Sequence, residues 1–87
     1  MYTIYSKPNC PQCDQAKLLL DTKGEEYNVI HLDVGQPKQN NLKYISREDL
    51  LKKIPTARMM PQIIKQHLDA EHYVGSYQEL KKIMSGT

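Results

Sequence analysis

Two cysteines, Cys10 and Cys13, are separated by two residues and are the side chains of this sequence best suited to chemistry. A disulfide stabilises a fold mainly by closing a long loop of the unfolded chain, and a bridge over two residues closes almost none. A structural zinc site needs further ligands, but His67 and His72 lie more than fifty residues beyond Cys13, outside the usual spacing. A reversible dithiol/disulfide couple is therefore favoured over a zinc site or two unrelated buried thiols.

The residues around the cysteines predict a strand followed by a helix. The segment Tyr2–Ser6 is rich in β-branched and aromatic residues, and residues 12–23 are helix formers with an apolar stripe. Pro11 suits the first helical position, where its missing N–H costs nothing. Cys10 is then the N-cap, where free backbone N–H groups and the helix dipole favour a thiolate over a thiol.

The two thiols are expected to differ in reactivity. The pKa of Cys10 should fall below the free value of about 8.5, and Lys7, three residues upstream, adds a nearby positive charge. Cys13 lies one turn into the helix, in line with Ala16 and Leu20, so its sulfur should be more buried and less ionised. Cys10 is therefore predicted to attack, and Cys13 to resolve the mixed disulfide.

The remaining chain predicts an α/β fold. Residues 27–32 predict a strand with no clearly polar face, as in a parallel sheet that helices cover on both sides. The elements that follow are a polar loop at 33–41, a helical region at 41–54, strands at 62–65 and 71–74, a helix after a capping box at 76–79, and a fraying tail at 85–87. The order β-α-β-α-β-β-α predicts one domain, 1–87, with a four-stranded mixed sheet and helices on both faces. The first and last helices should bring their N-terminal ends together near Cys10, where anions are favoured.

Composition excludes several classes of function. Twelve Lys and Arg against ten Asp and Glu leave a net charge of +2, without the basic excess typical of proteins that bind nucleic acids. The longest apolar runs have three residues, too few to span a bilayer, and no signal peptide is visible. We therefore expect a cytoplasmic protein with neither a nucleic-acid nor a membrane partner.

A Cys-Pro-x-Cys dithiol between the first strand and helix, an x-Pro dipeptide before a later strand and a glycine turn before the last helix occur together here. In this combination the whole chain resembles the glutaredoxin family, and most of all the small phage-encoded dithiol glutaredoxins. The resemblance implies a thioredoxin-like fold. It also implies a monomeric dithiol–disulfide oxidoreductase that reduces protein disulfides and glutathione mixed disulfides, with glutathione as co-substrate and no metal or tightly bound cofactor.

The resemblance further implies a substrate and glutathione site around the nucleophile, Cys10. Pro61 would be a cis-proline facing the disulfide. Met60 would pair its backbone N–H and C=O with an extended thiol substrate. The residues assigned to binding are Lys7, Pro11, Gln12, Met60, Pro61, Gly75, Ser76, Tyr77 and Gln78.

The sequence departs from the family pattern at positions that usually bind glutathione. Gln12 stands where the family often has Tyr, which replaces an aromatic wall by a polar amide. The usual glycine pair is Gly75-Ser76 here, and the acidic pair that follows is Gln78-Glu79. Weaker or altered use of glutathione is therefore expected, with protein substrates and reductants relatively more important.

Two further classes of function stay open in the sequence. A metal- or cluster-binding module would use the thiols as ligands, as in glutaredoxins that share an iron–sulfur cluster, although Pro11 stiffens the loop. A non-catalytic interaction domain on the same fold would still bind its partner without Cys10. If the protein is an oxidoreductase, analogy with the family implies that it passes electrons to disulfide-containing proteins such as ribonucleotide reductase. Glutathione or a thioredoxin reductase would then supply the electrons.

Overall fold

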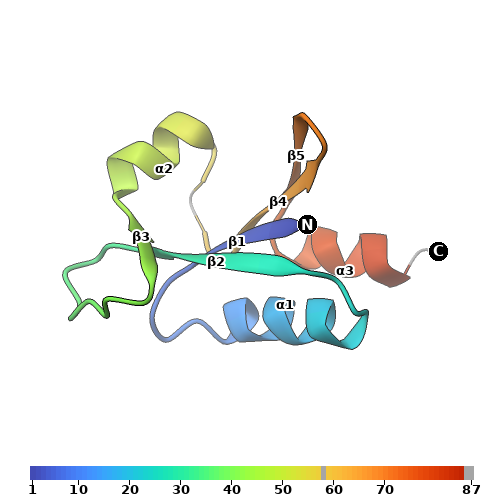
Figure 1. Cartoon of the computed structure of the whole chain (residues 1–87), viewed down its shortest axis with the longest axis horizontal. Helices are drawn as coiled ribbons and strands as arrows, with labels where there is room; N and C mark the ends of the chain where they lie inside the picture. The colour runs from blue at the N-terminus through green and yellow to red at the C-terminus, as the bar shows by residue number, and fades with distance from the viewer. Residues whose placement is uncertain (58, 86–87) are drawn as a thin grey trace.

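The computed structural model describes residues 1–57 and 59–85 as a five-stranded mixed sheet with three helices (Figure 1). The sheet order is β3-β2-β1-β4-β5, parallel between β1, β2 and β3 and antiparallel between β1, β4 and β5. The elements are β1 (Tyr2–Ser6), α1 (Pro11–Thr22), β2 (Tyr27–Leu32), β3 (Lys43–Ile45), α2 (Arg47–Lys53), β4 (Gln62–His67), β5 (Ala70–Gly75) and α3 (Tyr77–Ser85).

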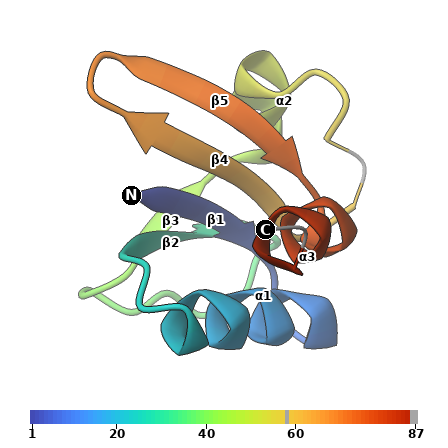
Figure 2. The same ribbon diagram turned by 90° about the vertical axis from the view of Figure 1, so that its right-hand side faces the viewer.

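The helices cover both faces of the sheet, as predicted: α1 and α3 lie on one face and α2 on the other (Figure 2). The central strand β1 is buried throughout, and its side chains alternate between two apolar clusters because strand side chains point to opposite faces in turn. The first cluster, under α1 and α3, contains Tyr2, Ile4, Ala16, Leu20, Ile63 and Leu80. The second, under α2, contains Tyr5, Leu32, Leu50, Ile54, Ala57 and Ile64.

The prediction of a four-stranded sheet was wrong. Lys43–Ile45, expected to lie within the helical region 41–54, forms β3, which pairs in parallel with the end of β2. Tyr44 and Ile45 favour strands, but a run of three residues is too short to form one alone, so this strand depends on pairing with a distant segment. Only Arg47–Lys53 of the region 41–54 is α-helical, and the Asp49 N–H donates to the hydroxyl of its N-cap, Ser46, at 3.1 Å.

The later elements confirm the predicted hairpin and final helix. Both hairpin strands are longer than expected, and Leu68 and Asp69 form the turn between them. Of the tail expected to fray, 85–87, Ser85 is the last residue of α3, and residues 86 and 87 lie outside the described residues. Within the described ranges, no helix combines the length and the apolar composition needed to cross a membrane.

Candidate active site

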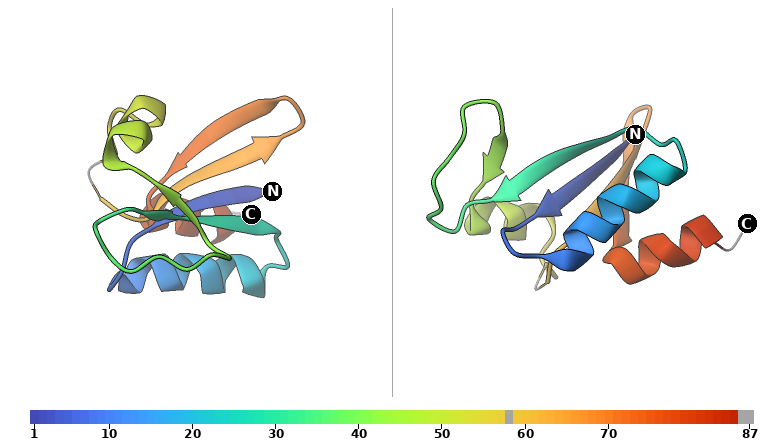
Figure 3. Two further views of the ribbon diagram at one scale, coloured as in Figure 1. Left: turned by 60° about the vertical axis from the view of Figure 1, so that its left-hand side comes forward. Right: turned by 90° about the horizontal axis from the view of Figure 1, so that it is seen from below.

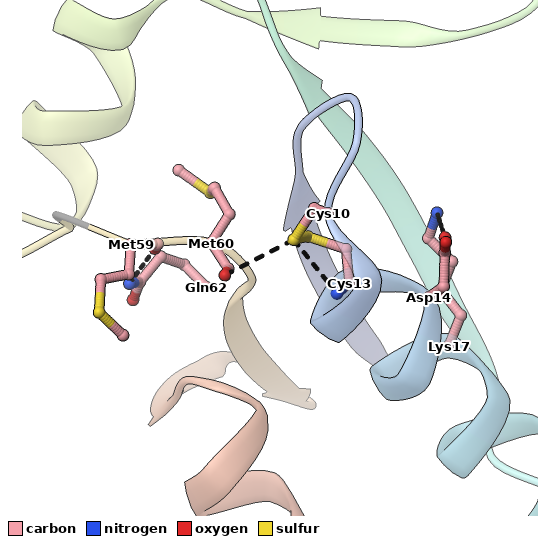
Figure 4. Close-up of a disulfide and its surroundings, with 7 residues drawn as sticks. All are labelled: Cys10, Cys13, Asp14, Lys17, Met59, Met60 and Gln62. Carbon is pink, nitrogen blue, oxygen red and sulfur yellow. Dashed lines mark hydrogen bonds and ion pairs between the residues drawn. A yellow bond between two sulfur atoms is a disulfide. The ribbon is translucent and has the colours of Figure 1, made fainter.

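Cys10 and Cys13 lie where β1 leads into α1, and a disulfide joins them with a Cα–Cα distance of 5.3 Å (Figure 4). Cys10 is the N-cap, with extended backbone angles of −121° and 95°, and Pro11 begins the helix. Just before them Asn9 adopts a left-handed conformation (φ 55°), which Asn tolerates better than most residues and which turns the chain toward the helix. The predicted junction is therefore present, with both cysteines at its helical end.

The environments of the two sulfurs differ. The Cys13 backbone N–H donates to Cys10 Sγ at 3.3 Å, so the cap is a sulfur rather than an oxygen. Cys13 is 1% exposed, in line with buried Ala16 and Leu20, whereas Cys10 is 8% exposed. An incoming disulfide can therefore reach the first sulfur more readily than the second.

A loop from the second half of the chain lies against the disulfide. The carbonyl oxygen of Met60 is 3.6 Å from Cys10 Sγ (Figure 4), and the Met60–Pro61 peptide bond is cis, as the resemblance implied. Pro61 is buried and Met60 half-buried. The backbone of Met60 is thus placed beside the sulfur that a substrate would reach.

Gln62, which the sequence analysis did not single out, fixes this loop from β4. Its side chain is buried, and its amide nitrogen donates to the Met59 carbonyl at 2.6 Å. The Tyr73 hydroxyl on β5 donates to the amide oxygen of Gln62, also at 2.6 Å. One amide therefore links the sheet to the residue before Met60. The sequence does contain one signal for the role of Gln62: it is a polar residue at the start of an apolar strand, directly after Pro61.

Replacing Gln62 by Leu is expected to lower the free energy of unfolding by about 1 kcal/mol, because the Met59 carbonyl loses its donor and the Tyr73 hydroxyl loses its acceptor. The KM for a peptide disulfide should rise more than kcat falls, since the loop beside Cys10 is held less firmly. Urea unfolding and steady-state kinetics measure the two effects. Tyr73→Phe is the matched control and should have the smaller effect, because Tyr73 is 54% exposed. Wild-type stability and KM in Gln62→Leu would show that the amide does not position the loop.

The Gly75–Gln78 segment forms the turn into α3, and its conformation requires glycine at the first position. Gly75 has φ 117°, and a Cβ there would lie 3.0 Å from Glu79 Cγ. The Ser76 hydroxyl donates to the Glu79 carboxylate, which joins the ends of the predicted capping box and lowers the pKa of Glu79. Tyr77 is half-buried and Gln78 exposed.

The N-terminal ends of α1 and α3 lie at the same end of the molecule, and the two helices pack together (Figure 3). Backbone N–H groups at helix starts attract anions, so this end is suited to a carboxylate-bearing ligand. The expected approach of the two helix ends is confirmed.

The other predicted binding residues lie on the surface around Cys10. Pro11 and Gln12 are exposed on the first turn of α1. Lys7 is exposed between two hollows, one that it lines with Cys10 and one that it lines with Met60. Among residues 1–57 and 59–85, no three His, Cys, Asp or Glu side chains gather into a possible metal site.

Three comparisons with known proteins give consistent results. The glutaredoxin family model matches residues 2–68. Glutaredoxin 3 of Escherichia coli strain K12 is 33% identical over 72 residues, which cover 83% of this chain and 72% of that protein, and the O157:H7 protein gives the same values. A solved structure of glutaredoxin 1 from Francisella tularensis, complexed with cacodylate, has a TM-score of 0.58 and covers 92% of this chain and 86% of its own. At 17% identity, that likeness shows a shared fold alone.

Proposed function

The chain belongs to the glutaredoxin family of thiol–disulfide oxidoreductases, and from this premise we propose that it reduces protein disulfides and glutathione mixed disulfides through Cys10 and Cys13. The observation that carries the proposal is the hydrogen bond from the Cys13 N–H to Cys10 Sγ at the start of α1. A backbone donor and the positive end of a helix both stabilise a thiolate, which is the nucleophile in disulfide exchange.

The proposed reaction transfers two electrons to the substrate disulfide. The Cys10 thiolate attacks one substrate sulfur, the substrate S–S bond breaks, and the other substrate sulfur leaves as a thiolate that takes up a proton. Cys13 then loses its proton and attacks Cys10 Sγ, which breaks the mixed disulfide and releases the second substrate thiol. The product is the Cys10–Cys13 disulfide, and two molecules of glutathione return it to the dithiol as they form glutathione disulfide.

The proposed binding residues surround this pair. Met60 would pair its backbone with an extended substrate, as in strand addition, because its carbonyl lies beside Cys10 Sγ. Glutathione, the family's co-substrate, would lie toward the Gly75–Gln78 turn with Lys7 and Gln12 at its edges. We expect its binding to be weaker than is usual in the family, because Ser76 and Gln78 replace a glycine and an acidic residue.

The wider setting follows by analogy with the family. Ribonucleotide reductase is the proposed recipient of electrons, and a thioredoxin reductase is a second possible donor beside glutathione. A single-domain monomer acting in the cytoplasm, that of the host if the gene is carried by a phage, completes the proposal.

Alkylation of the reduced protein tests the proposal through the ionisation of its thiols. Cys10 should react with iodoacetamide faster than Cys13, with a pH midpoint below the value of about 8.5 for a free thiol. Mass spectrometry of the two cysteines after digestion, with Cys13→Ser and Cys10→Ser proteins as single-thiol references, assigns each rate. Slow, equal alkylation of both thiols would remove the basis for assigning Cys10 as the nucleophile.

A further inference from the structure

A polar cleft opens beside Cys10, on the side away from Met60, with a volume of about 380 Å³. In Figure 4 Met60 lies on one side of Cys10, and Asp14 and Lys17, which line the cleft, lie on the other. This volume falls within the range of about 300–1,000 Å³ found for pockets that hold small ligands. The cleft is therefore large enough to receive part of a substrate bound to the nucleophile.

The floor of the cleft is a row of polar residues across three parallel strands. Ser6 of β1 is the register partner of His31 in β2, which is the partner of Tyr44 in β3, so the three side chains project from one face. They lie near the carboxyl ends of the strands, where open α/β sheets usually bind their ligands. The edge strand β3, which the sequence did not predict, thus extends the floor beyond the β1-α1-β2 unit.

Residues 36–39 form another wall of the cleft, and two hydrogen bonds hold this loop in place. The Gln39 N–H donates to the Tyr44 hydroxyl at 2.9 Å, and the Gln36 amide donates to the Leu32 carbonyl at 2.9 Å. Both glutamines line the cleft and provide further polar groups. This side of the cleft is therefore a wall with defined hydrogen bonds.

The charges around the cleft favour an anion. Two lysines, Lys7 and Lys17, and one carboxylate, Asp14, line it, and Lys17 Nζ is 3.7 Å from the Asp14 carboxylate. Burial, and next the charge of Lys17, lower the pKa of His31 below its usual value, which disfavours the charged imidazolium form. The lining thus carries a net positive charge and several hydrogen-bonding groups.

We propose that this cleft binds an acidic segment of a protein substrate, next to the cysteine that bonds to Cys10, with Lys17 as a specificity-determining contact. The inference rests on the proposed function and names the class of protein it acts on. A substrate joined to Cys10 through a cysteine has chain on both sides of that bond. One side would pair with Met60, and the other passes over the cleft, where carboxylates meet Lys17 and Lys7.

The test compares two disulfide peptides that differ only in having Glu or Gln at the positions flanking the cysteine. The ratio of their kcat/KM values, acidic over neutral, is measured for the wild type, Lys17→Gln and Asp14→Asn. Lys17→Gln should lower the ratio about two- to fivefold, and Asp14→Asn, which frees Lys17, should raise it by a similar factor. Any change in Cys10 itself cancels in the ratio, because both peptides react with the same thiolate.

The matched control is Lys81→Gln. Lys81 is an exposed residue of α3 that does not line the cleft, so removing its positive charge should leave the ratio at the wild-type value. An unchanged ratio in both cleft variants, or shifts in the same direction, would overturn the proposal. A change in the KM for glutathione without a change in the ratio would assign the cleft to glutathione instead. Reduction of the neutral peptide tests the proposed disulfide reduction alone, because that peptide carries no acidic segment. If the wild type reduces neither peptide, both the proposed function and the proposed role of the cleft are wrong.

Discussion

Replacing Cys10 by Ser is expected to lower the reduction of protein disulfides and glutathione mixed disulfides by about a thousandfold or more, the scale of loss when an enzyme loses its nucleophile. Both reactions begin with attack by this sulfur. A serine hydroxyl in the same place is not ionised near neutral pH and forms no disulfide. Cys13 cannot take over, because it is 1% exposed and lies behind Cys10. Steady-state assays with a peptide disulfide and a glutathione mixed disulfide measure the loss.

The structure makes this variant a test of chemistry rather than of folding. Ser is among the preferred N-cap residues, and its hydroxyl can accept the Cys13 N–H as the sulfur does now. The reduced wild type is the proper reference, since the variant has no disulfide. Urea unfolding should give similar stabilities for the two proteins. A variant that folds normally and keeps a tenth or more of the activity would show that the nucleophile lies elsewhere.

The reactive centre could be predicted from the sequence because neighbouring residues determine it. Pro11 fixes the first helical position, so Cys10 becomes the cap and Cys13 falls on the buried stripe one turn later. The same holds for Ser46, whose hydroxyl accepts the Asp49 N–H as predicted; Ser76 and Glu79, the ends of the other predicted capping box, are joined by a hydrogen bond between their side chains. Each of these features is encoded within four residues, so no knowledge of tertiary pairing was needed.

Features that depend on distant pairing were not predictable in the same way. β3 exists because Lys43–Ile45 meets the end of β2, and its own three residues are too short a run to distinguish a strand from a helical turn. The link from Gln62 to Met59 and Tyr73 requires β4 and β5 to be paired in one register. The cleft beside Cys10 combines both kinds of feature. The Cys10 cap is encoded by neighbouring residues, whereas the edge strand β3 forms only when distant segments pair.

The prediction for residues 27–32 shows the same limit within one element. The strand and its parallel pairing with β1 are confirmed, but its residues are mostly half-buried rather than covered on both faces. β3 pairs only with residues 30–32, and Leu32, near α2, is the one buried member of β2. Apolar composition therefore indicated a strand, but the extent of covering depended on where the next elements were placed.

Replacing Cys13 by Ser should separate the two halves of the reaction. Attack by Cys10 is retained, so a protein substrate should become trapped as a mixed disulfide instead of being released. Resolution by Cys13 is intramolecular, with the two Cα atoms 5.3 Å apart, whereas a thiol from solution must first diffuse to the bond. Turnover of protein disulfides should fall about a hundredfold or more at low glutathione.

Intact-mass measurement under non-reducing conditions detects the trapped species directly. The Cys13→Ser protein should gain the mass of one substrate half, and added glutathione should release it. Cys10→Ser is the control and should gain no mass, because the buried thiol cannot reach the substrate. Reduction of a glutathione mixed disulfide needs only the outer sulfur, so in Cys13→Ser it should fall far less than reduction of a protein disulfide. Rapid release of the protein substrate without added thiol would mean that another group resolves the intermediate, and Cys13 would lose its assigned role.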